Sequence, residues 1–281
     1  MPRTARRLRR LAMIATLSGI TGTLEGCIAR RGVPTESFTV SAADAREDMS
    51  RMRGEPVELE RPVVVLAGYR AFPTLVSQVV WRLYPITSGD QDDYLPIAYT
   101  FQTDIEAIAA MVTERVEATW PSDDPSRTVE VDVIGVSMGG LVARTAALPV
   151  GGLPSGHETR SKQLRIGTLY SMGSPHGGAK LAERIAPDKA ARDMIPGSPF
   201  LTALDAAFED RDYGVVPYAV LNDTWVGATN AAPPEHLPVW TPGTHAFSHF
   251  MITRDMRIMA DVARRLRGEA PLGLPAAVPS D

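Results

Sequence analysis

Cysteine is almost absent from this sequence of 281 residues, which contains only Cys27. Without a second cysteine, no disulfide can form within the chain. A long hydrophobic run is also missing, because the mostly apolar residues 11–24 are too few for a comfortable membrane span. The formal net charge is −4 and charges of both signs are mixed along the chain, which argues against a nucleic-acid partner. Histidine is scarce, and the five present leave few candidates for a general base.

The N-terminal residues have the layout of an export signal. The first ten residues contain five arginines: Arg3, Arg6, Arg7, Arg9 and Arg10. An apolar stretch and small residues follow, which predicts a signal peptide over residues 1–26. The cysteine at its end resembles that of a bacterial lipobox, so we expect export and lipid attachment at Cys27, with the protein anchored to a membrane. A plain signal peptide, giving a secreted or periplasmic protein, and an uncleaved anchor are the alternatives.

Three further parts are predicted along the chain. Residues 27–60 are polar and charged and are expected to form a tether leading into an amphipathic helix over 42–52. Residues 61–267 suit one large domain. The proline-rich residues 268–281 are expected to be a disordered tail.

Apolar runs alternate with helical patterns within the domain. Strands are predicted at 62–66, 94–99, 129–136, 164–171 and 215–221, helices at 75–83, 105–116, 141–147 and 253–267, and a loop at 240–249. Such an alternation predicts an α/β fold with a mostly parallel, doubly wound sheet. Ligands of these sheets bind at the carboxyl ends of the strands, where the candidate residues also lie.

Residues 179–213 are long for a connection between two strands. They contain two short helical patterns separated by prolines. A segment of this length is a candidate lid over the site, and a fixed helical excursion is the alternative.

The stretch 128–147 predicts a buried strand, a sharp turn and a helix. Its centre reads Gly-Val-Ser-Met-Gly over 135–139 and matches G-x-S-x-G, the pattern of a nucleophile elbow, with no second match in the chain. The two glycines leave no side chain to block a tight approach of strand and helix. Ser137 would point out of the sheet edge and is the predicted nucleophile, unless the turn carries no chemistry.

A serine hydroxyl is too weakly acidic to attack an ester unaided, so it needs a general base. In this architecture the chain order is serine, then acid, then histidine. His249 directly precedes an apolar cluster and the last predicted helix, so it is the preferred base, with His245 as the alternative. His176 precedes every candidate acid and is expected to shape the site instead.

The acid should follow one of the last strands. The loop over 172–178 contains no carboxylate, whereas Asp223 comes at the start of the loop after the strand at 215–221. Asp223 is therefore the predicted acid, and an exposed turn residue is the alternative role for it. Asp205 and Asp212 are the next carboxylates to consider.

Two backbone N–H groups are expected to form an oxyanion hole. One belongs to Met138, directly after the nucleophile. The other should come from the loop after the strand at 62–66, where Tyr69 is the preferred donor and Arg70 the alternative. An ordinary strand–helix turn would supply no such donor.

These motifs resemble those of a known family. Residues 135–144 read Gly-Val-Ser-Met-Gly-Gly-Leu-Val-Ala-Arg and resemble the elbow of α/β-hydrolase lipases, which commonly reads G-H-S-M-G-G-L-V-A-R. Residues 173–178 resemble the T-P-H-x-G segment of these lipases, and residues 196–201 resemble a segment of their lid region. The likeness spans roughly 61–267 and extends loosely to lipases related to GPI inositol-deacylases. It implies the α/β-hydrolase fold and carboxylic-ester hydrolysis without a metal or an organic cofactor.

The sequence therefore predicts a serine hydrolase that acts on an acyl ester or lipid through an acyl-enzyme on Ser137. An acyltransferase or a thioesterase would use the same three residues. A catalytically silent hydrolase fold, serving as a surface lipoprotein that binds a partner, belongs to a different class of function.

Overall fold

The structure is a computed structural model that describes residues 34–157, 159–243 and 248–279. The predicted signal peptide over 1–26, Cys27 and His245 lie outside the described residues. No helix in the described part of the chain is long and apolar enough to cross a membrane.

Within the described residues, six strands form one parallel sheet in the order β2-β1-β3-β4-β5-β6. The strands are β1 (Val63–Leu66), β2 (Tyr94–Ile97), β3 (Arg127–Val136), β4 (Gln163–Met172), β5 (Gly214–Val220) and β6 (Val239–Thr241). The chain runs outward from β1 to β2 and then crosses to β3 on the other side of β1. This reversal makes the β1–β3 junction the switch point at which such sheets bind ligands.

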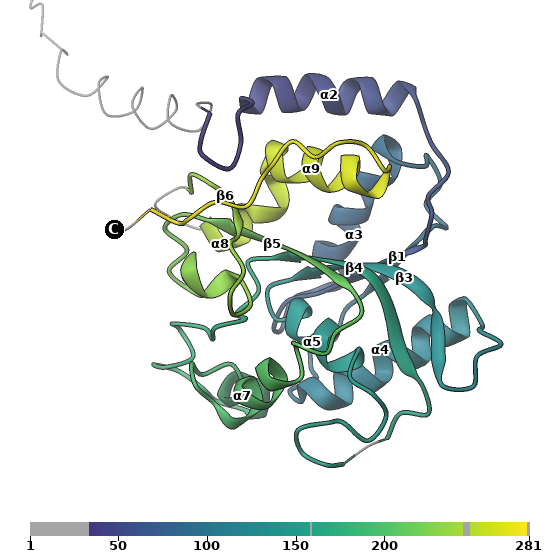
Figure 1. The fold of residues 1–281 in the computed structure, drawn as a ribbon, viewed down its shortest axis with the longest axis vertical. Coiled ribbons are helices and arrows are strands. Elements are labelled where there is room, and N and C mark those ends of the chain that lie inside the picture. The colour runs from purple at the N-terminus through teal and green to yellow at the C-terminus, as the bar shows by residue number, and fades with distance from the viewer. Residues whose placement is uncertain (1–33, 158, 244–247, 280–281) are drawn as a thin grey trace, which may run out of the picture.

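Helices cover both faces of the sheet (Figure 1). On one face lie α3 (Pro73–Leu83) and α9 (Met256–Leu266), with α2 (Ala42–Gly54) outside α9. On the other lie α4 (Ile105–Thr119) and α5 (Gly139–Ala146). All four residues of β1 are fully buried, as expected for an apolar strand between two helical layers. The predicted α/β class and parallel sheet are confirmed.

The connection from β4 to β5 contains α6 (Lys189–Asp193) and α7 (Pro199–Ala206), joined by turns. These helices lie within the predicted 179–213 insertion. Short 3₁₀ helices occur at Tyr84–Ile86, Thr229–Ala231 and Ile252–Arg254.

The loop predicted at 240–249 is wrong at its first residues. Trp240 and Thr241 belong to β6, which pairs in parallel with the end of β5. Pro238 and Pro242 flank this strand and hide it in the sequence. The helix predicted at 253–267 is also divided, because the side chain of Asp255 accepts a hydrogen bond from Arg257 N–H and begins α9 there.

The tether predicted over 27–60 and the tail predicted over 268–281 are corrected where the structure describes them. Phe38 is fully buried and forms an isolated antiparallel bridge with Gly273. Leu274 N–H donates to the carbonyl of Ser37 at 2.9 Å, and Trp240 Nε1 donates to the carbonyl of Ala277 at 3.0 Å. The tail therefore has backbone partners in the domain as far as Ala277, in place of the predicted disorder.

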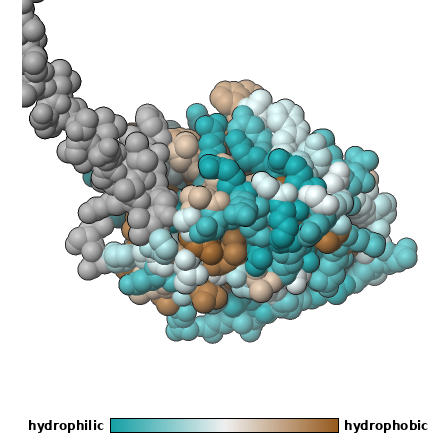
Figure 2. All heavy atoms as spheres, turned by 90° about the horizontal axis from the view of Figure 1, so that it is seen from above, coloured by the Kyte–Doolittle hydropathy of each residue, from teal (hydrophilic) through white to brown (hydrophobic). Residues whose placement is uncertain are grey.

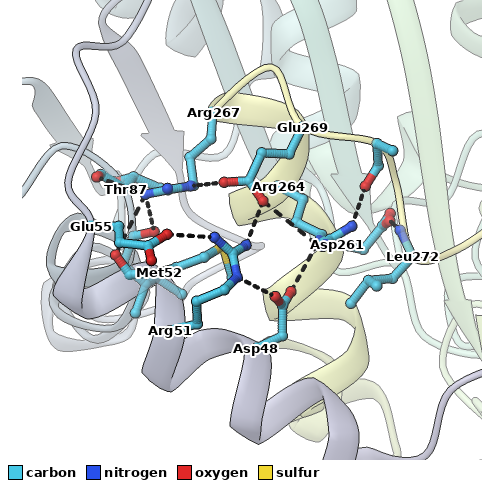
Figure 3. A network of polar contacts seen from close by, with 12 residues as sticks. Asp48, Arg51, Met52, Glu55, Thr87, Asp261, Arg264, Arg267, Glu269 and Leu272 are labelled. Carbon is cyan, nitrogen blue, oxygen red and sulfur yellow. Dashed lines mark hydrogen bonds and ion pairs between the residues drawn. The ribbon is translucent and has the colours of Figure 1, made fainter.

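Charged side chains fasten α2 to α9 and the loop that follows it (Figure 3). Asp48 accepts from Arg264 Nε at 2.8 Å, and Arg51 Nε donates to the same carboxylate group at 3.0 Å. Arg51 also reaches Glu269, which accepts from Arg267 Nε at 2.6 Å. The N-terminal helix is thus part of the domain.

Candidate active site

Ser137 lies at the turn between β3 and α5, with a backbone φ of 52° that non-glycine residues rarely adopt. A Cβ at Gly135 would lie 2.6 Å from the nitrogen of Gly140, and one at Gly139 would lie 2.7 Å from the carbonyl oxygen of Leu66. Both glycines of the motif are therefore required for the close approach of β3, α5 and β1. The packing holds the serine in its strained conformation.

The structure brings Ser137, His249 and Asp223 together. Ser137 Oγ lies 2.9 Å from His249 Nε2, and His249 Nδ1 lies 2.8 Å from Asp223 Oδ2. His249 belongs to α8 (Ser248–Met251), and Asp223 follows β5. Each of the three thus comes from a loop or helix beyond the carboxyl end of a strand.

Asp223 is buried and is held as a carboxylate. Its Oδ1 accepts hydrogen bonds from the N–H groups of Trp225 at 2.9 Å and Val226 at 3.0 Å. Burial alone would raise the pKa of Asp223, but the hydrogen bonds from His249 and these two N–H groups outweigh it and lower the pKa. An ionised acid at this position would accept the Nδ1 proton of the imidazole and select its tautomer.

Aromatic rings fix the orientation of the His249 imidazole. Trp225 stacks on it with centroids 5.7 Å apart and an interplanar angle of 11°. Phe250 meets the imidazole edge-on, also with centroids 5.7 Å apart. Gly173, with a φ of 59°, passes so close that a Cβ there would lie 3.6 Å from the ring. The imidazole is therefore confined on several sides.

The loop after β1 lies against the serine. A Cβ at Gly68 would be 3.1 Å from the Cβ of Ser137. Neither Tyr69 N–H nor Met138 N–H donates to any residue in the described ranges. Arg70, the alternative donor, has a φ of 52°, and its side chain pairs with Asp188 at 2.8 Å.

A cavity of about 420 Å³ opens beside Ser137 and His249. Most of its walls are apolar, and the β4–β5 connection supplies much of them: Ala179, Leu181, Ala182, Ile185, Ala191 and Met194. Leu75, Trp225 and Phe250 contribute from other elements. Its size is in the range of small-molecule sites in proteins.

The other residues considered from the sequence lie elsewhere. His176 is fully buried, with Nε2 2.9 Å from Ser171 Oγ and Nδ1 3.2 Å from Arg144 Nη1. Asp205 pairs with Arg144 at 2.8 Å, and Asp212 pairs with Arg127 at 2.9 Å. His176 forms no hydrogen bond with Ser137, Asp223 or His249, and through Arg144 it is linked to Leu204 and Asp205.

Asp188 is a residue of this region that the sequence analysis missed. Its Oδ2 accepts from Tyr69 Oη at 2.6 Å and from Arg70 Nη2 at 2.8 Å. It also caps α6 by accepting from Ala191 N–H at 3.0 Å. Its partners Tyr69 and Arg70, in the loop after β1, are more than a hundred positions away, and no local pattern marks the contact.

Comparison with models of protein families and with curated protein sequences gives no match. Among solved structures, the lipase BlEst2 of Bacillus licheniformis in propeptide form is similar, with 14% identity and a TM-score of 0.52 over 80% of this chain. The chain spans 54% of that form. The mature form of BlEst2 has 14% identity and a TM-score of 0.50, over 78% of this chain and 95% of the lipase. With its parallel sheet and flanking helices, the chain has the α/β-hydrolase fold.

Proposed function

We propose that this protein is a serine hydrolase that cleaves carboxylic esters of apolar acyl groups through an acyl-enzyme on Ser137. The carrying observation is the hydrogen-bonded series from Ser137 Oγ through His249 to Asp223, which opens into an apolar cavity. A nucleophile, a base and an orienting acid in this order are the requirements of acyl transfer to serine.

In the first half of the reaction, Ser137 Oγ attacks the ester carbonyl carbon and its proton moves to His249 Nε2. The negative charge that develops on the carbonyl oxygen is stabilised by Met138 N–H and Tyr69 N–H. The intermediate collapses as the ester C–O bond breaks, and His249 gives the proton to the leaving alkoxide. The products are an acyl-enzyme and an alcohol.

In the second half, a water molecule donates a proton to His249 Nε2 and attacks the acyl carbon. The tetrahedral intermediate then expels Ser137 Oγ, which recovers its proton from the imidazolium. Asp223 stabilises that imidazolium in both halves and remains ionised, consistent with its lowered pKa. The acid product leaves and the enzyme is restored.

The cavity favours an uncharged acyl chain over a charged one. Arg70 is the only charged residue among its described lining residues other than the catalytic histidine, and its guanidinium is paired with Asp188. A charged substrate group inside would lose its hydration without gaining a partner.

Hydrolysis of a p-nitrophenyl ester series from short to long acyl chains tests this function. Ser137→Ala should lower kcat by roughly 10⁴- to 10⁶-fold with an unchanged fold, since the three residues act as one unit. The exposed Ser161→Ala is the matched control and should keep full activity. A wild-type chain that neither turns over the esters nor reacts with a fluorophosphonate would instead be a silent scaffold.

An acyltransferase or thioesterase would share the acyl-enzyme, so the same preparation should be given thioesters and competing alcohols. Water should be the main acceptor and oxygen esters the better substrates. Product analysis by mass spectrometry would reveal acyl transfer, and dominant transfer would contradict the hydrolase assignment.

A further inference from the structure

A second cavity, of about 260 Å³, lies between α2, the end of α3 and the start of α9. Four arginines line it: Arg46, Arg53, Arg82 and Arg254. No carboxylate is among its lining residues in the described part of the chain. We call this cavity the arginine groove. Figure 2 shows the molecule from the α2 side, where hydrophilic side chains surround smaller hydrophobic patches.

The four guanidinium groups lack a carboxylate partner among residues 34–157, 159–243 and 248–279. None of them forms an ion pair with a residue of the described ranges. Arg82 donates to the carbonyl of Gln78 at 3.1 Å, and Arg254 makes a long contact of 3.4 Å with the Gln78 side chain. The chain contains more Asp and Glu residues than Lys and Arg residues. On the same helix, by contrast with the four arginines, Arg51 pairs with Asp48 and Glu55. The groove therefore brings together four guanidinium groups that have no carboxylate partner in the described part of the chain.

The spacing on α2 places this charge on one face. Arg46 and Arg53 are seven positions apart, with Met49 and Ser50 between them on the same side of the helix. Burial lowers the pKa of Arg82, and the nearby charge of Arg254 lowers it further. Four like charges without partners repel one another, and an anion bound between them would relieve that repulsion.

Phosphate suits the groove because several guanidinium groups can each donate two hydrogen bonds to its oxygens. The groove also has an apolar component. Met49, Met256 and Met259 line it, and Trp81 stands at its side with 60% of its surface exposed. Tryptophan beside arginine is typical of surfaces that meet lipid headgroups. The ligand should thus be an amphiphile.

Two segments of the chain contribute residues both to the groove and to the catalytic cavity. Thr253 lines the catalytic cavity and its neighbour Arg254 lines the groove. Helix α3 likewise contributes Leu75 to the first cavity and Trp81 to the second. We propose that the arginine groove binds the phosphate group of an anionic lipid headgroup, on segments that also line the catalytic cavity. This proposal concerns binding alone and does not depend on the ester-hydrolase assignment.

Fluorescence titration of the full chain tests the proposal, with monomeric dihexanoyl phosphatidylglycerol as the probe. The Ser137→Ala background prevents any consumption of the probe. The chain has four tryptophans. The fluorescence change that reports binding in the groove is the part that is lost in the Trp81→Phe variant. It should saturate with phosphatidylglycerol and be much weaker with dihexanoyl phosphatidylcholine.

The variant Arg53→Gln/Arg254→Gln should weaken phosphatidylglycerol binding about 25-fold, at roughly fivefold for each exposed arginine. Arg115→Gln is the control, because this arginine is exposed on α4 at the opposite face and forms no ion pair with a described residue. Equal weakening by Arg115→Gln and by the double variant, or equal binding of both lipids, would overturn the proposal. Inorganic phosphate that binds as tightly as the lipid would overturn the lipid assignment. Unchanged melting temperatures establish that each variant folds.

Discussion

His176 is a fully buried histidine whose two ring nitrogens both have partners. Arginine can only donate, so Nδ1 accepts from Arg144 and Nε2 carries the proton that is donated to Ser171 Oγ. Arg144 in turn holds the carbonyl of Leu204 at 2.9 Å and the carboxylate of Asp205 at 2.8 Å. Neutral His176 therefore connects the strand beside the elbow to α7. Burial first, and the charge of Arg144 second, lower the pKa of His176 well below 6.5.

This lowered pKa predicts a dependence of stability on pH. At this position the unfolded chain binds a proton near pH 6.5 and the folded protein does not. The contribution of His176 to the free energy of unfolding is therefore fully present above that pH. It is lost as the pH falls from there toward the folded pKa, by at most about 1.4 kcal/mol per pH unit. Urea unfolding should be measured at several values between about pH 5 and pH 7. The free energy of unfolding should change less steeply with pH for His176→Gln than for the wild type. If the free energy of unfolding depends on pH equally in the wild type and in His176→Gln, the assignment of a buried neutral imidazole is contradicted.

The three residues of the candidate site carried local signals in the sequence. Ser137 lies in a complete elbow motif, Asp223 begins the loop after a strand, and His249 directly precedes an apolar cluster and the last predicted helix. Chain order left both His245 and His249 open, and only these neighbours favoured His249. His176 was recognised only as a neighbour of the site, because its partner Arg144 becomes its neighbour only when β4 and α5 pack together. Long-range polar contacts of this kind leave no periodic pattern.

Asp188 links the β4–β5 connection to the loop after β1. This carboxylate accepts from Tyr69 Oη and Arg70 Nη2 while it caps α6. Burial would raise the pKa of Asp188, but the hydrogen bonds from Tyr69, Ala191 and Arg70 lower it. Since Tyr69 also supplies the proposed oxyanion donor, Asp188 is a positioning residue that acts through the loop backbone.

Asp188→Ala should therefore lower kcat for ester hydrolysis by roughly 10- to 100-fold, because small displacements of an oxyanion donor are costly. KM should change less, since the substitution removes no side chain that lines the acyl cavity and only the cap of α6 is lost from its wall. Asp188→Asn should recover most of the activity, because the amide oxygen still accepts from Tyr69. The exposed Asp210→Ala is the matched control. A loss confined to KM would show that Asp188 acts on substrate binding and not on the oxyanion loop.

At the scale of elements, strong periodic patterns predicted strands β1 to β5 to within one or two residues. β6 was missed because three residues between two prolines show no alternation, and its pairing with β5 is a tertiary contact. The division before α9 depends on one capping side chain, Asp255, which a continuous apolar stripe conceals. Short elements and helix ends are decided by partners elsewhere in the chain.

The N-terminal and C-terminal segments of the described chain contact each other. Ser37 and Phe38 contact Leu274 and Gly273, and Asp261 of α9 holds the tail in place (Figure 3). Its Oδ1 accepts from Leu272 N–H at 2.7 Å and Gly273 N–H at 2.8 Å. Proline-rich composition predicts disorder only when backbone groups have no partners, and here a buried carboxylate provides them.

A chain that ends at Glu269 should consequently be destabilised. It leaves the Asp261 carboxylate without the two N–H donors and uncovers Phe38, which together should cost about 3 kcal/mol of unfolding free energy. For a protein of this size the melting temperature should fall by roughly 6–12 °C.

A chain that ends at Pro279 is the control and should melt like the full chain, since the contacts to Asp261, Ser37 and Trp240 all involve residues 272–277. Ester hydrolysis at low temperature should survive the shorter chain, because the tail does not line the catalytic cavity. Equal melting temperatures for the two chains would mean that the tail adds nothing to the fold.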